Sequence, residues 1–386
     1  MQLAEPMSRL GTETAFKVLA KAKALEAQGR EVVHLEIGEP DFDTPSNIVQ
    51  AGIRALQSGH THYVPAAGIP QLREAIAHYI GTTRGIQVDP NMVVVTPGGK
   101  PVMFYAILAL VNPGDEVLYP NPGFPIYESM IRFVNGVPVP TPLTDKNNFR
   151  LDLDHFRESI TPRTRMVILN SPANPTGGVM TQDDVRAVAD MLADRPDIIV
   201  LSDEIYDRIL YSGEHYSIAS LPGFQDRTII LNGFSKTYAM TGWRLGYGVM
   251  PTRLAEPITT LMINSNSCTA AFTQWAGVEA LTGPQDSVEH MLDAFRARRE
   301  VIVEGLNAIP GIRCAMPEGA FYAFPNIEGT GRSADQLADE LLQKAGVAVL
   351  SGTAFGQYGQ GYLRLSYANS IPNIKKALER VADVLS

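Results

Sequence analysis

The chain has 386 residues, with 32 Lys and Arg against 41 Asp and Glu, so its formal net charge is −9. This acidic balance excludes the basic footprint of a nucleic-acid-binding protein, and a hydrophobic content of 45% excludes a mainly disordered chain. The first thirty residues lack the pattern of a signal peptide, and no run approaches the roughly 18 apolar residues that cross a bilayer. We therefore expect a cytoplasmic protein that binds neither nucleic acid nor a membrane.

A charged helix is expected first, over residues 12–28, followed by a region in which short apolar runs alternate with helical patterns. The apolar runs cover residues 92–95, 115–119, 165–169, 197–201 and 227–231. Apolar runs without polar alternation are typical of strands that are covered on both faces, as in a parallel sheet between helices. The chain is thus predicted to be α/β, with a large domain over residues 46–285 built on a mostly parallel central sheet.

The C-terminal part has a different pattern. A long amphipathic helix is expected over 286–306, followed by short strands, of which the clearest covers 361–367, and by a helix over 374–385. This mixture predicts a smaller α+β domain formed by residues 286–386 with the N-terminal segment 1–45. The sequence leaves open with which unit the helix over 12–28 packs.

Polar side chains follow three neighbouring strands at the point where each strand ends. One run leads to Asn174, the next to Asp203 and Tyr206, and the third to Lys236. Open α/β sheets bind ligands at the carboxyl ends of their strands, so an amide, a carboxylate, a phenol and an amine are expected to meet in one crevice. Each residue alone is more often a turn, cap or surface residue, but their occurrence at successive strand ends favours a functional site.

These groups fit the chemistry of a pyridine aldehyde cofactor. A lysine forms a Schiff base only as the neutral amine, which requires a lowered pKa. A carboxylate keeps the ring nitrogen protonated, so that the ring accepts electrons, while a phenol and an amide stabilise the ring oxygen. The turn around Gly99 and Lys100 opens a helix and could bind a phosphate, and Arg244 could bind it through two hydrogen bonds.

Several long motifs in this order resemble the class I/II pyridoxal-phosphate-dependent aminotransferases of fold type I. They include 35–42, 174–177, 202–206, 232–246 and 364–367, so that the resemblance covers nearly the whole chain. The sequence is most similar to the branch that contains aspartate, aromatic and alanine aminotransferases. The resemblance implies pyridoxal 5′-phosphate as the cofactor and a homodimer with shared active sites.

The resemblance also implies a role for each candidate residue. Lys236 matches the Schiff-base lysine, Asp203 the partner of the ring nitrogen, and Tyr206 with Asn174 the hydrogen-bond donors to the ring oxygen. The remaining matches are cofactor ligands and substrate ligands: Ser235, Arg244, Gly99 and Lys100 at the phosphate, Phe124 stacked on the ring, Tyr63 reaching the phosphate of the neighbouring subunit, and Arg364 with Gly38 and Asn174 at the substrate α-carboxylate.

The implied reaction exchanges an amino group between an L-amino acid and a 2-oxo acid such as 2-oxoglutarate, by a ping-pong mechanism. The sequence does not choose the donor: Lys100 could bind a side-chain carboxylate or merely lie near phosphate or solvent, and Phe16 suits an apolar side chain. A β-lyase of the same fold is the alternative reaction, and a non-catalytic binding protein is the alternative class. No metal is expected, because the seven histidines lack metal-ligand spacing.

Overall fold

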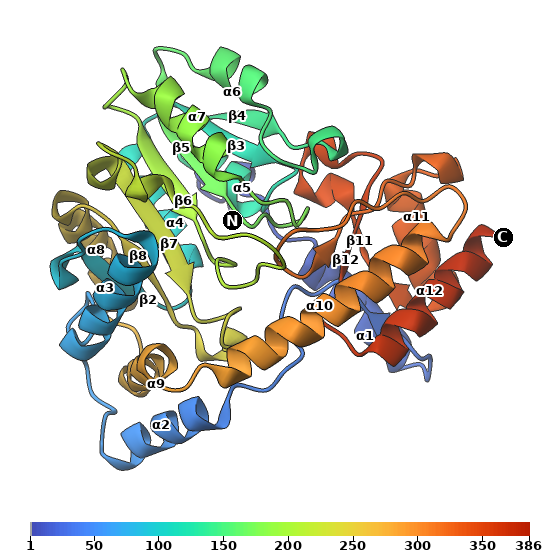
Figure 1. Cartoon of the computed structure of the whole chain (residues 1–386), viewed down its shortest axis with the longest axis horizontal. Coiled ribbons are helices and arrows are strands. Elements are labelled where there is room, and N and C mark those ends of the chain that lie inside the picture. Colours follow the sequence, from blue (N-terminus) through green and yellow to red (C-terminus); the bar gives the residue numbers. More distant parts are fainter. Residues whose placement is uncertain (1) are drawn as a thin grey trace.

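A seven-stranded sheet organises the computed structural model, which describes residues 2–386 (Figure 1). The strand order is β2-β8-β7-β6-β5-β3-β4, and every strand except β8 runs in the same direction. The strands are β2 (Val93–Thr96), β3 (Glu116–Asn121), β4 (Val137–Pro142), β5 (Thr164–Asn170), β6 (Ile199–Asp203), β7 (Thr228–Gly233) and β8 (Gly246–Val249). The predicted α/β class with a mostly parallel central sheet is confirmed.

Helices cover both faces of this sheet, which explains why its strands are apolar without alternation. On one face, the side chains of α4 (Lys100–Leu110), α5 (Ile126–Phe133) and α8 (Thr252–Asn266) pack against the strands. The opposite face is covered by α3 (Pro70–Arg84) and α9 (Ala271–Thr282) at one end and by α6 (Leu153–Ser159) and α7 (Gln182–Leu192) at the other. The helix α2 (Ser46–Gln57) lies against α9 (Figure 1).

Two strands of the sheet were not predicted from the sequence. Strand β4 contains Pro138, Pro140 and Pro142, which lack an N–H group and argue against a strand. It lies at the edge of the sheet, where the alternate residues bond to β3 and the prolines lose no ladder bond. Strand β8 has only four residues, two of them glycines, and it is the one antiparallel member of a sheet that the apolar runs predict as parallel.

A second group of elements packs beside the large sheet (Figure 1). It contains the helices α10 (Asp286–Asn307), α11 (Ala334–Glu340) and α12 (Ile371–Leu385) and a small antiparallel sheet of β9 (Tyr322–Ala323), β11 (Leu350–Ser351) and β12 (Leu363–Ser366). The N-terminal part joins it through β1 (Val33–His34), which pairs with β10 (Val347–Ala348), and α1 (Ala15–Glu26) contacts β10. Among residues 2–386, no helix is long and apolar enough to cross a membrane.

Candidate active site

A cavity of about 570 Å³ opens at the carboxyl ends of β5, β6 and β7. The strand-end residues Asn174, Asp203 and Lys236 line it together, as the parallel arrangement predicts. The N-terminal segment, the loop after β1 and the strand β12 close the cavity from the side of the second group of elements. The site therefore lies between the two groups of elements.

Lys236 follows β7 on the connection to β8. Its Nζ lies in the cavity and donates a hydrogen bond to the carbonyl oxygen of Gly38 at 2.6 Å. Burial disfavours the charged amine and lowers its pKa to about 8, and the positive charge of Arg364 acts in the same direction. The lowered pKa increases the neutral fraction of the amine near physiological pH, and the neutral amine is the form that attacks a carbonyl.

Asp203 ends β6 and is buried. The Tyr127 hydroxyl, from α5, donates a hydrogen bond of 2.5 Å to its Oδ2, and the backbone amide of Ile205 donates to its Oδ1 at 3.3 Å. Burial raises the pKa of this carboxyl to about 6, although both hydrogen bonds oppose the shift. Within residues 2–386 no cation is in hydrogen-bond contact with this carboxylate, and such a buried carboxylate is suited to hold a protonated group of a ligand.

Tyr206 lies one turn beyond Asp203 and is also buried. Its hydroxyl shares a hydrogen bond of 2.7 Å with the hydroxyl of Tyr322 on β9. Burial raises the pKa of Tyr206 well above the ordinary value, so this side chain remains a neutral donor. The site thus offers a neutral phenol beside a carboxylate that titrates at much lower pH.

The turn between β2 and α4 provides a place for an anion. The helix begins at Lys100, so the backbone amides of Gly99 and Lys100 precede its hydrogen-bond ladder, whereas Pro101 has no N–H and the Val102 amide donates to the Gly99 carbonyl at 3.0 Å. Gly98 has φ +91°, and a Cβ there would lie 2.4 Å from Nη2 of Arg244. Glycine is therefore required for the arginine to approach this turn. Ser235 and Arg244 line the same end of the cavity, and Arg244 Nη1 donates to the carbonyl of Thr241 at 2.8 Å.

Arg364, at the centre of β12, supplies a buried cation. Its Nη1 donates to Oδ1 of Asn174 at 3.3 Å, and its Nη2 donates to the carbonyl of Glu36. Its Nε lacks a hydrogen-bond partner among residues 2–386. Burial lowers the pKa of the guanidinium, although it lies over the rings of Tyr322 and Phe355. A buried guanidinium without a paired carboxylate is suited to bind the carboxylate of a ligand.

Lys100 is a further cation that lines the cavity, and it already has a partner. Nζ of Lys100 forms an ion pair with the carboxylate of Glu13 and lies 5.4 Å from the ring centre of Phe124. The side chain of Lys100 is 45% exposed. Phe16, which also lines the cavity, is largely exposed. This end of the cavity therefore combines an apolar ring with a neutralised pair of charges.

The cavity brings together nearly all residues that the sequence singles out. They are Gly38, Gly99, Lys100, Phe124, Asn174, Asp203, Tyr206, Ser235, Lys236, Arg244 and Arg364. Tyr63 is the exception: its side chain is 89% exposed and does not line the cavity of its own chain. Tyr127 and Tyr322 are additional residues that sequence reasoning missed. The spacing of three residues between Phe124 and Tyr127 indicates one face of a helix, but no signal links Tyr322 to the site.

Comparison with known proteins identifies the family. The family model described as "Aminotransferase class I and II" matches residues 30–381. The chain belongs to the class I and II aminotransferase family. It is 39% identical to the aspartate aminotransferase of Bacillus sp. strain YM-2 over 98% of each chain, and 40% identical to an aromatic-amino-acid aminotransferase of Thermococcus litoralis over 93% of each. The solved structure of Thermus thermophilus aspartate aminotransferase with maleate matches with a TM-score of 0.95 and 39% identity over the full length of both chains.

The resemblance read from the sequence motifs is thus confirmed, and so is the activity class. The chain is an aminotransferase, and a β-lyase of the same fold is not favoured. The cavity at the strand ends is the candidate active site of this aminotransferase.

Proposed function

We propose that this aminotransferase uses pyridoxal 5′-phosphate, and that Lys236, Asp203 and Tyr206 act on it. The observation that carries the proposal is a single cavity lined by an amine whose pKa is lowered by desolvation, a buried carboxylate and a buried phenol. When bound, pyridoxal phosphate supplies an aldehyde that condenses with amines and a ring that accepts electrons from the substrate Cα. Asp203 would hold the ring nitrogen, Tyr206 and Asn174 the ring oxygen.

The turn between β2 and α4, called the anion turn below, is the proposed binding site for the phosphate of the cofactor. The phosphate would be held by Ser235, Arg244 and the backbone amides of Gly99 and Lys100, because they combine the N–H fork of an arginine with the N-terminus of α4. Phe124 would cover one face of the ring. The requirement for glycine at position 98 supports this assignment, since any side chain there would displace Arg244.

The substrates we propose are an L-amino acid of the aspartate, aromatic or alanine type and a 2-oxo acid such as 2-oxoglutarate. Arg364 would bind the α-carboxylate, assisted by Asn174 and by the backbone at Gly38. The amine of Lys236 would then take the proton from the substrate Cα as a general base and, as a general acid, deliver it to the carbon that carried the cofactor aldehyde. The hydrogen bond from Lys236 to the Gly38 carbonyl keeps the amine at this edge of the cavity.

We further propose the arrangement that the family resemblance implies. Residues 46–285 would form the cofactor-binding domain, and 1–45 with 286–386 the small domain; the shared core of Val33 and Leu35 with α10 and α12 supports the second grouping. The chain would act as a homodimer in which Tyr63 reaches the phosphate in the neighbouring subunit. The high exposure of Tyr63, near the exposed Leu56 of α2, supports this proposal.

The test is the half-reaction with a single amino acid. The purified protein loaded with pyridoxal phosphate should release a stoichiometric amount of 2-oxo acid when one donor amino acid is added, with a change in its visible spectrum. Lys236→Ala should reduce kcat by about 10⁴-fold or more, because general base and acid are lost together. Replacement of the exposed Lys146 is the control. Near-normal turnover by Lys236→Ala would contradict the proposal.

A further inference from the structure

Asp203 and Tyr206 share a short segment in which each is followed by an acidic residue. Asp203 and Tyr206 line the cavity, whereas the next residues, Glu204 and Asp207, do not. The strand β6 ends at Asp203 and the chain turns over the next residues, so that Asp203 and Tyr206 face the cavity while the two carboxylates lie outside its lining. Glu204 and Asp207 are buried, which requires partners for their charges.

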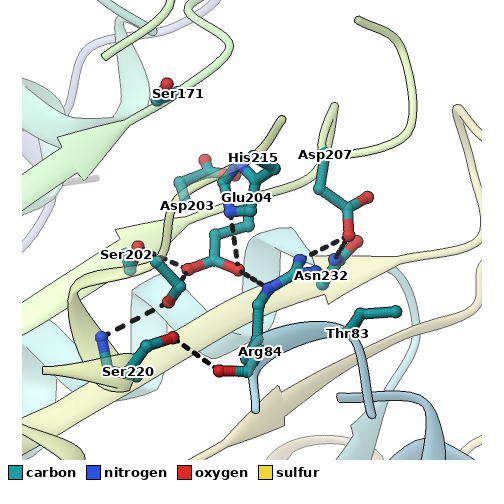
Figure 2. Close-up of polar contacts among 12 residues, drawn as sticks. Thr83, Arg84, Ser171, Ser202, Asp203, Glu204, Asp207, His215, Ser220 and Asn232 are labelled. Carbon is teal, nitrogen blue, oxygen red and sulfur yellow. Dashed lines mark hydrogen bonds and ion pairs between the residues drawn. The ribbon is translucent and has the colours of Figure 1, made fainter. Parts of the chain in front are cut away.

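A single arginine binds both carboxylates. Arg84 is the last residue of α3, and its side chain is only 4% exposed. Its Nε donates to Oε2 of Glu204 at 2.8 Å, and its Nη2 donates to Oδ2 of Asp207 at 2.5 Å. Figure 2 shows the guanidinium lying between the two carboxylates. The planar fork of an arginine fixes both distances at once, which a point charge cannot do.

The other contacts of Glu204 supply further polar partners to both oxygens of its carboxylate. The hydroxyls of Ser202 and Ser217 donate to its Oε1 at 2.8 and 2.5 Å. His215 Nε2 lies 3.1 Å from its Oε2 (Figure 2). Burial alone would raise the pKa of Glu204, but Arg84 and His215 hold it well below the ordinary value, so the group stays ionised.

Asp207 is held in the same way from other elements. Besides Arg84, the amide of Asn232 on β7 donates to its Oδ2 at 3.0 Å, and the hydroxyl of Tyr79 on α3 donates at 3.1 Å. Arg84 itself is fixed by its backbone, because its carbonyl accepts a hydrogen bond from the Ser220 hydroxyl at 2.7 Å. The segment is therefore anchored to α3, which packs on the sheet, and to β7, which is a strand of the sheet.

We propose that Arg84 is a positioning residue, which sets the spacing between the Asp203 carboxylate and the Tyr206 hydroxyl by binding the residue after each of them. The proposal rests on the proposed function, because both groups must meet one cofactor ring. Loss of the contact with Glu204 would release Asp203 and leave Tyr206 in place. Loss of the contact with Asp207 would release Tyr206 and leave Asp203 in place.

The test compares variants of this cluster with a matched control. Arg84→Lys keeps the positive charge but loses the planar guanidinium that binds both carboxylates at once. Asp207→Asn weakens the contact of Arg84 with the residue next to Tyr206. Glu116→Gln is the control, since Glu116 is a buried carboxylate that binds Arg163 at the other end of the same sheet. Each protein is loaded with pyridoxal phosphate. We measure kcat/KM, the affinity of the apo-protein for the cofactor, the pH midpoint of the cofactor absorbance and the melting temperature.

Arg84→Lys should lower kcat/KM by about 10²-fold, the effect expected of a displacement near 1 Å. Asp207→Asn should raise the pH midpoint of the absorbance by about one unit, because a weaker hydrogen bond from Tyr206 no longer favours the ionised ring oxygen. Glu116→Gln should change neither quantity, even where it lowers the melting temperature as much. A lowered melting temperature with unchanged kcat/KM, pH midpoint and cofactor affinity in the Arg84 and Asp207 variants would overturn the proposal. Failure of the unmodified protein to bind the cofactor would instead refute the proposed function.

Discussion

At the scale of single residues, the buried amine of Lys236 gives the site its reactivity. Burial lowers its pKa to about 8 from 10.5. Competitive acylation of the apo-protein, followed by peptide mass analysis, should therefore show half-maximal reactivity of Lys236 near pH 8, with the exposed Lys375 as the reference. A titration of Lys236 near pH 10.5 would contradict the electrostatic account.

The same shift predicts how the apo-protein responds to pH. The unfolded chain binds more protons than the folded protein between about pH 8 and 10.5, because the folded pKa of Lys236 is the lower one. Through Lys236, the free energy of unfolding therefore falls as the pH is lowered from about 10.5 to about 8, and Lys236 adds no further pH dependence below that range. Lys236→Met should flatten this dependence in urea unfolding curves; an unchanged slope would show that the amine is not buried.

The ion pair between Glu13 and Lys100 predicts an effect on donor selectivity. Glu13 neutralises the cation that could bind the side-chain carboxylate of aspartate. Glu13→Gln should lower KM for aspartate by about twofold to fivefold, the range for partly exposed ion pairs, and leave KM for phenylalanine unchanged. Steady-state kinetics with the two donors measure this. Equal changes for both donors would mean that Lys100 does not contact the side-chain carboxylate.

The residues at the strand ends could be predicted because parallel strands bring their carboxyl ends to one edge. Asn174, Asp203 and Lys236 meet in the cavity for this reason. Tyr322 could not be predicted in the same way. It reaches Tyr206 only because β9 of the small sheet packs with the segment that follows β6, and no local pattern encodes that contact.

At the scale of elements, burial on both faces made five of the seven sheet strands predictable from apolar runs. Strands β4 and β8 were not predicted, because the prolines of β4 and the glycines of β8 are residue types that are typical of turns. The conformation of these two strands is decided by their place in the sheet. The glycines of β8 have a local function. Gly246 lies so close to the turn after β2 that a Cβ would lie 2.4 Å from the Gly98 carbonyl carbon, which holds the anion turn against β8.

The helix α7 illustrates a pattern that the sequence does encode. Thr181 followed by Asp183 and Asp184 is typical of a helix N-terminus with an acidic first turn, and the structure has α7 with a capping box between Thr181 and Asp184. Local side-chain to backbone bonds set this boundary, so it needs no knowledge of the tertiary fold. The segment from Asp203 to Asp207 is the opposite case, because its conformation depends on Arg84, about 120 residues earlier.

At the scale of the whole molecule, the exposed Tyr63 predicts that two chains complete each active site. Mixing Tyr63→Phe with Lys236→Ala subunits should produce hybrid dimers with one site free of both substitutions. The activity of the mixture after exchange of subunits should then exceed that of either variant alone. If Tyr63 served only its own chain, every hybrid site would carry one substitution and the mixture would show no gain.

The most direct test of the account is covalent. Its central claim is that the amine of Lys236 reaches the aldehyde of pyridoxal phosphate in the cavity that also contains Asp203. Reduction of the loaded protein with borohydride should fix the pyridoxyl group on Lys236, and peptide mass analysis should find it there and nowhere else. A label on another lysine, or no label after loading, would contradict the account.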